Sequence, residues 1–124
     1  GERAGWHFDS PFRVGINNVW GSWFAYRVAI LTNTNITPSA KQNTVSPCLN
    51  CHTRDCIQAC PTEALDSSVL SFETCIEYRK LVNSSCQNTC HSRVACPVAV
   101  QHRYTQEQLH YHYSVSLKTI KAYY

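Results

Sequence analysis

Residues 48–61 read CLNCHTRDCIQACP, with four cysteines within thirteen positions and a proline directly after the last one. A second cysteine set follows and also ends in a cysteine–proline pair, Cys96-Pro97. The two sets contain every cysteine of the protein: Cys48, Cys51, Cys56, Cys60, Cys75, Cys86, Cys90 and Cys96. Eight thiols in 124 residues indicate either metal binding or a disulfide framework.

Three chemistries compete for these thiols. Disulfides suit an oxidising compartment and require no proline after a cysteine. Zinc favours close pairs, and the only C-x2-C pair joins Cys48 to Cys51, with His52 or His91 as a further ligand. The bacterial two-cluster iron–sulfur pattern places three close cysteines before a fourth that precedes proline and ligates the other cluster. The repeated Cys-Pro ending therefore favours two [4Fe-4S] clusters, with zinc and disulfides as alternatives.

The two-cluster pattern predicts a crossed assignment of the thiols. A proline turns the chain away after the fourth ligand, so that this thiolate can point toward the neighbouring cluster. Four residues separate Cys51 from Cys56 where two are usual, but longer loops cost little chain entropy. A metal-free chain should lose most of its fold. One cluster would bind Cys48, Cys51, Cys56 and Cys96, and the other Cys60, Cys75, Cys86 and Cys90.

Composition favours one domain with an apolar core, since 44% of the residues are hydrophobic. No apolar run is long enough to span a bilayer. The formal charge of +3 would fall to about −1 with two clusters of about −2 each, and the basic residues form no block, so no nucleic-acid partner is expected. The chain contains no methionine, which suggests a trimmed start. We expect a cytoplasmic protein, or one of an organellar matrix if a targeting segment was removed.

The sequence of the N-terminal third predicts loops followed by one strand. Residues 1–20 lack periodicity, and their aromatic side chains, Trp6, Phe8, Phe12 and Trp20, should pack into the core by default. Residues 22–32 are the most apolar run and predict a buried strand over 26–32, with Arg27 at an exposed edge or paired. Residues 33–47 are rich in Asn, Thr, Ser and Pro and predict a linker.

Short helices are expected between and after the cysteines. Residues 54–60 predict a helix with Cys56 and Cys60 on one face, followed by a turn or short helix over 62–66. Ser71 is a candidate N-cap for a helix over 72–81. Cys75, Tyr78 and Val82 would share one face of that helix.

Residues 83–104 have loop-like composition, whereas the C-terminus gives the clearest helical pattern. Thr105 and Gln108 form a capping box. His110 and His112 flank the following apolar stripe and should lie at the surface or its rim. The stripe is amphipathic and comprises Leu109, Tyr113, Leu117 and Ile120.

Three stretches resemble the dicluster ferredoxin family, and more closely the iron–sulfur part of epoxyqueuosine reductase and its short ferredoxin-like relatives. They are GSWFAYR at 21–27, CIQACPTEAL at 56–65 and ACPV at 95–98, and the likeness spans most of residues 5–104. In those reductases a cobalamin-binding domain precedes this region and supplies the reaction chemistry. The resemblance implies that this chain has the electron-delivery module alone, so cobalamin is not expected to bind it.

The expected fold is an α+β, loop-rich, ferredoxin-like dicluster domain with short helices around the clusters. One structural domain would contain an aromatic N-terminal segment with a strand (1–35), a dicluster region (45–104) and an amphipathic C-terminal helix (105–124).

Electron transfer is the leading functional hypothesis, with another redox protein or a larger complex as partner. Asp9, Asp55 and Asp66 are isolated, and no catalytic pattern is present, so an electron carrier is favoured over an enzyme. The alternatives are a fragment or relative of a cobalamin-dependent epoxyqueuosine-type reductase, and a metal-stabilised structural subunit. Trp6, Trp20 and Trp23 could line a docking face, although packing in the core is expected for each.

Overall fold

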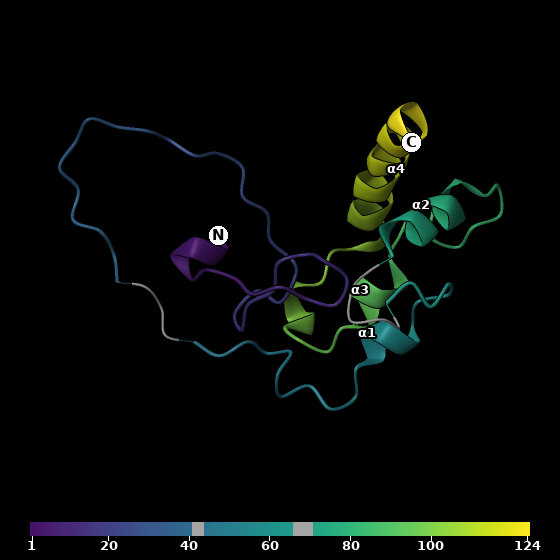
Figure 1. Cartoon of the computed structure of the whole chain (residues 1–124), viewed down its shortest axis with the longest axis horizontal. Helices are drawn as coiled ribbons and strands as arrows, with labels where there is room; N and C mark the ends of the chain where they lie inside the picture. Colours follow the sequence, from purple (N-terminus) through teal and green to yellow (C-terminus); the bar gives the residue numbers. More distant parts are fainter. Residues whose placement is uncertain (41–43, 66–70) are drawn as a thin grey trace.

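Helices are the main regular structure of the computed structural model, which describes residues 1–40, 44–65 and 71–124 (Figure 1). Within these ranges four α-helices follow one another: α1 (Asp55–Gln58), α2 (Phe72–Lys80), α3 (His91–Ala95) and α4 (Gln106–Tyr123). Glu2–Ala4 and Val100–His102 form single 3-10 turns. The β-structure of the described chain consists of two isolated bridges, Phe8 to Ile16 and Asn17 to Gly21. The protein is small and α-rich, and the expected α+β ferredoxin-like fold is not confirmed.

The strand predicted over residues 26–32 is wrong. This segment is extended but exposed: the exposed fractions of Val28 and Ile30 are 75% each, and that of Leu31 is 100%. Residues 25–40 run away from the helices in a wide excursion (Figure 1). A strand is stabilised by pairing and by burial of one face, and the described residues provide neither here. Arg27 is likewise exposed.

The C-terminal helix agrees with its prediction. The Thr105 hydroxyl accepts a hydrogen bond from the Gln108 N–H at 3.3 Å, and the Gln108 side chain accepts one from the Thr105 N–H at 2.9 Å. Leu109, Leu117 and Ile120 are buried, while Tyr113 is half-buried. His110 and His112 are exposed, as predicted.

The helix predicted over 72–81 is α2, and Ser71 caps it by accepting a hydrogen bond from the Thr74 N–H. Cys75 and Tyr78 are half-buried on this helix, which packs against α4. Val82 does not share their face, because α2 ends at Lys80 and the Val82 side chain is 86% exposed.

Two short helices differ from expectation. α1 ends at Gln58, so it is shorter than the predicted helix over 54–60, and residues 61–65 form turns; Asp66 lies outside the described residues. α3 lies within the region expected to be loop. Its N-cap, Cys90, makes no side-chain capping bond, so the sequence carries no start signal. α3 packs against α1, and such short helices depend on packing rather than on propensity.

The N-terminal segment contributes part of the core. Phe12, Ile16 and Trp23 are buried, Phe8 is partly buried, and Trp6 and Trp20 are about half exposed, so the default expectation of core packing is wrong for the last two. Gly21 has φ = 58°, and a Cβ there would lie 2.5 Å from the Val98 carbonyl oxygen. Only glycine fits here, and its missing side chain lets the segment pack directly against the residues that follow Cys96-Pro97.

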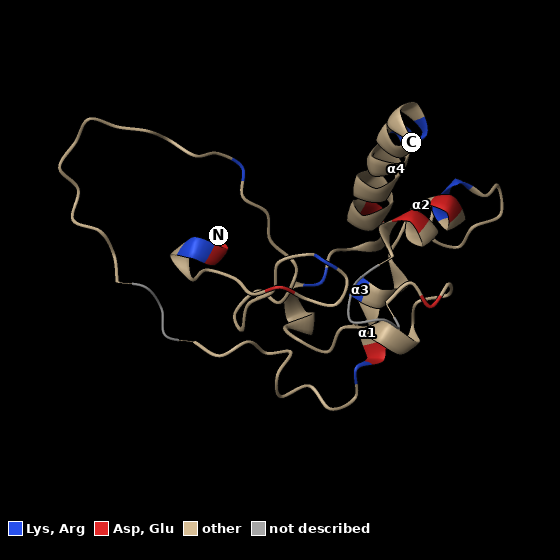
Figure 2. Ribbon diagram, viewed as in Figure 1, with Lys and Arg blue, Asp and Glu red and all other residues tan. Residues whose placement is uncertain are grey.

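Lys, Arg, Asp and Glu positions are spread along the ribbon, and α2 carries both signs of charge (Figure 2). Within the described ranges, no helix combines the length and apolarity needed to cross a membrane.

Candidate metal centres

The eight thiols lie in two sets of four, and each set lines its own cavity. The first thiol set borders a cavity of about 570 Å³ and comprises Cys48, Cys51, Cys56 and Cys96. The second thiol set borders one of about 90 Å³ and comprises Cys60, Cys75, Cys86 and Cys90. All eight lie in described residues and are free thiols. The structure thus brings the thiols together in the crossed arrangement, while iron binding itself stays a prediction.

The crossing begins at the end of α1. Cys56 is buried within this helix, and Cys60 lies in the turn after it. Because α1 stops at Gln58 and Pro61 follows, the helical face expected to present both thiols does not exist. The two side chains instead reach different cavities.

The two Cys-Pro turns share one local geometry. The Cys60 sulfur accepts a hydrogen bond from the backbone N–H of Thr62, and the Cys96 sulfur accepts one from that of Val98. In each turn the donor lies two residues after the cysteine. Such N–H groups stabilise negative charge on sulfur, as a thiolate ligand requires.

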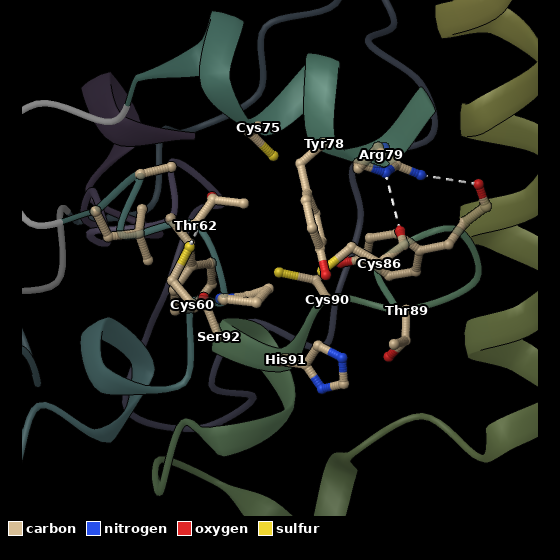
Figure 3. Close-up of a pocket in the computed structure, with 15 residues that line it drawn as sticks. Cys60, Thr62, Cys75, Tyr78, Arg79, Cys86, Thr89, Cys90, His91 and Ser92 are labelled. Atoms are coloured by element: carbon tan, nitrogen blue, oxygen red, sulfur yellow. Dashed lines mark hydrogen bonds between the residues drawn. The ribbon is translucent and has the colours of Figure 1, made fainter. Parts of the chain in front are cut away.

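The second thiol set draws its members from four separate places. Cys75 lies on α2, Cys90 directly precedes α3, Cys86 comes from the loop between them, and Cys60 follows α1. Their side chains face a common space below α2 (Figure 3). Phe12, Tyr78 and Tyr113 also line this space, so aromatic rings limit its contact with water.

The thiol pKa values reflect burial and mutual proximity. Burial, followed by the charges of the neighbouring Cys96, Cys48 and Cys51 as thiolates, raises the pKa of Cys56 to about 11. Burial likewise raises the pKa of Cys75, with the nearby Cys90 as the next cause. At Cys60 burial acts in the same direction, but hydrogen bonds from Thr62, Ala64 and Ser92 outweigh it and lower the pKa. Each set is therefore a concentration of potential negative charge.

Two buried arginines that sequence reasoning did not single out lie near these thiols. Arg79 lines the second cavity and donates hydrogen bonds to the Cys86 carbonyl, the Tyr113 carbonyl and the Ser116 hydroxyl. Its position four residues after Cys75 on a predicted helix was the available signal.

Arg93 lies on α3, between the last two cysteines of the chain. Its guanidinium stacks over Trp23 at 4.5 Å and over Tyr104 at 5.1 Å, and donates hydrogen bonds to Ser22. No pattern in the sequence indicated this partner, because Ser22 lies 71 residues away.

The residues present fit an anionic cluster held by thiolates. The ion pairs found within the described residues join Arg13 to Asp9 and Lys80 to Glu77, so neither buried arginine has a carboxylate partner there. A buried cation without a counter-charge is unfavourable, and an anionic group beside Arg79 would remove this cost.

A mononuclear metal site would need three or four donor atoms around one point. Among residues 1–40, 44–65 and 71–124, no three His, Cys, Asp or Glu side chains converge closely enough to hold one metal ion. Thiolates that bind four different irons of a cluster need no such common point. His52, proposed as a zinc ligand, is exposed and lines neither cavity, whereas His91 lines the second.

Comparison with known proteins adds no identification: no family model, curated protein or solved structure matches the chain.

Proposed function

We propose that the chain transfers electrons through two [4Fe-4S] clusters, one held by each thiol set, as a small ferredoxin-like protein or an electron-delivery subunit. One observation carries the proposal: eight thiols form two quartets around separate cavities, with Cys60 and Cys96 exchanged between the sequence-local groups. Four thiolates are the usual ligand set of such a cluster, and each cluster supplies one-electron redox chemistry when bound.

The surrounding residues have roles that suit this chemistry. The N–H groups of Thr62 and Val98 would stabilise the thiolates of Cys60 and Cys96. Phe12 lines both cavities and would exclude water between them. The side chains would thereby hold both sites in fixed geometry while an electron passes.

An electron carrier needs a donor and an acceptor, so the proposal implies another redox protein or a larger complex as partner. Free thiols and iron–sulfur ligands fit a reducing compartment, either the cytoplasm or an organellar matrix. The resemblance to the iron–sulfur part of epoxyqueuosine reductase supports the same role.

Metal and sulfide analysis of anaerobically purified protein tests the proposal. We expect about eight iron and about eight sulfide per chain, and a visible absorption band that bleaches with dithionite as a paramagnetic signal develops. Colourless protein without acid-labile sulfide, or protein with stoichiometric zinc, would overturn it.

A structural role for the same metal centres is the second candidate. The observation in its favour is that Cys56 and Cys96 belong to the central apolar cluster together with Phe12, Ile16 and Leu65. Clusters that no physiological donor can reduce would favour this role over electron transfer. For the reductase alternative, titration with cobalamin is decisive, and we expect no binding by this chain alone.

A further inference from the structure

The Arg79 guanidinium is buried beside the second thiol set. The side chain is 8% exposed and lies on the last turn of α2. Its three hydrogen bonds reach the Cys86 carbonyl at 3.1 Å and the Tyr113 carbonyl at 3.0 Å, both drawn in Figure 3, and the Ser116 hydroxyl at 3.2 Å. Every acceptor is neutral, so these bonds fix the guanidinium in place without cancelling its charge.

Arg79 is the one permanently charged side chain among the described residues that line this cavity. Further charge would come from a protonated His91 or from the four thiols as thiolates. Coulomb energies rise as the local dielectric falls, so a fixed cation here acts more strongly on its neighbours than one in water. Charge and fixed position together make Arg79 a counter-ion for whatever the second thiol set holds.

Among the described residues that line the first cavity, no buried cation corresponds to Arg79. Arg13 and Arg54 line this cavity and Arg103 lies near Cys96, but all three are exposed, and Arg13 lies 4.0 Å from Asp9. Solvent and salt screen exposed charges, and the Asp9 carboxylate offsets part of the Arg13 charge. The two sites therefore differ in their electrostatic surroundings although their ligands are the same.

Hydrogen bonds to sulfur occur in both sets, so the difference between the two sites lies in the buried charge of Arg79. In the second set, Cys60 accepts from Thr62, Ala64 and Ser92, and Cys86 accepts from the His91 N–H. In the first set, Cys56 accepts from the Ile57 N–H, Cys96 from the Val98 N–H and Cys48 from Ser46. Hydrogen bonds to the sulfurs and nearby positive charge both favour the reduced, more negative state of an iron–sulfur cluster.

We propose that Arg79 gives the second thiol set the higher reduction potential of the two, so that an electron entering the protein comes to rest there. This inference rests on the proposed function. A one-electron donor, such as a reduced flavin or another iron–sulfur protein, supplies the electron, and the occupied site gains one negative charge with no bond made or broken. Arg79 is a positioning residue for that charge and ligates nothing.

The first test is an anaerobic redox titration of Arg79→Gln holoprotein, followed by electron paramagnetic resonance. We expect the reduction potential of the higher-potential step to fall by at least about 59 mV. For one electron this is about a tenfold decrease in the equilibrium constant for reduction. Arg79→Lys should retain most of the wild-type potential, because it keeps the charge. Arg54→Gln, which removes an exposed cation at the other cavity, is the matched control and should leave the upper step unchanged.

The second test assigns the steps and does not depend on whether Arg79→Gln loads its clusters. Cys75→Ser removes or alters the second site only, so the step that keeps its wild-type potential belongs to the first thiol set. We expect that surviving step to be the lower one. A surviving upper step, or an upper step that Arg79→Gln does not move in loaded protein, would overturn the inference.

These outcomes remain distinct from failure of the proposed function. Protein without iron and sulfide contradicts both proposals. Protein with two clusters and the reverse order of potentials contradicts only the role of Arg79.

Discussion

At the scale of single residues, Cys60 and Cys96 decide how the molecule is organised. Each follows three closer neighbours in sequence, yet each lines the cavity of the other group. This exchange could be predicted because both residues precede proline, a local signal with a known geometric effect. The contacts of Arg79 and Arg93 could not be predicted in the same way. Their hydrogen-bond acceptors either lie 34 or more residues away in the sequence or are backbone carbonyls, which no residue type marks.

Paired substitutions test the exchange. With iron and sulfide in excess, Cys96→Ser should remove about half of the iron, because one of two four-thiol sites loses a ligand. Adding Cys96→Ser to Cys51→Ser should cost little more iron, since both lie in the first set, whereas adding it to Cys75→Ser should remove nearly all. Iron per folded chain, measured after anaerobic reconstitution, distinguishes these results. The opposite pattern of additivity would show that the sites are not crossed.

At the scale of elements, locally encoded structure was predictable and structure that depends on distant contacts was not. Thr105 and Ser71 start α4 and α2 through bonds to residues three positions on, so the signal lies within one turn. α3 has no cap and depends on packing against α1. Residues 26–32 have the composition of a strand, but composition does not supply a pairing partner.

The capping box makes α4 testable by one substitution. Thr105→Ala should lower the free energy of unfolding by about 1 kcal/mol, because the Gln108 N–H loses its acceptor. Thr119→Ala, within the same helix and exposed, caps nothing and should be neutral or slightly stabilising. Anaerobic denaturant unfolding followed by circular dichroism measures both. Equal effects of the two changes would contradict a specific role of the cap.

The extended segment that includes Arg27 predicts where proteases act first. Arg27 is exposed in an extended backbone without strand pairing, whereas Arg79 and Arg93 are buried on helices. Trypsin should therefore cleave after Arg27 well before it cleaves after either helical arginine. Mass spectrometry of fragments over a time course gives the order. Early cleavage after Arg79 or Arg93 in the holoprotein would contradict the described burial.

At the scale of the whole molecule, the core is small and partly made of cysteine. Its central cluster contains Phe12, Ile16 and Leu65 together with Cys56 and Cys96, and the thiol sets join α1, α2 and α3. Small domains with so little apolar volume commonly require a metal or disulfides for stability.

Removal of the metal should therefore unfold most of the chain. Iron extraction with a chelator under reducing conditions should abolish near-ultraviolet dichroism and most helical signal, and reconstitution should restore both. Adding only buffer and reductant is the control. Extracted protein that keeps its helical signal and melts at the same temperature would show that the fold does not depend on these sites.

The exchange of Cys60 and Cys96 also bears on how the protein matures after synthesis. Filling the first site draws Cys96 to Cys56, and this brings Cys90, at the start of α3, close to Cys60, so that two of the four thiols of the second site are gathered. The loop that the second cofactor must close is then shorter, and its entropic cost is lower. Maturation should thus be cooperative: at limiting iron and sulfide, chains should be found mostly empty or mostly complete, with half-filled chains scarce.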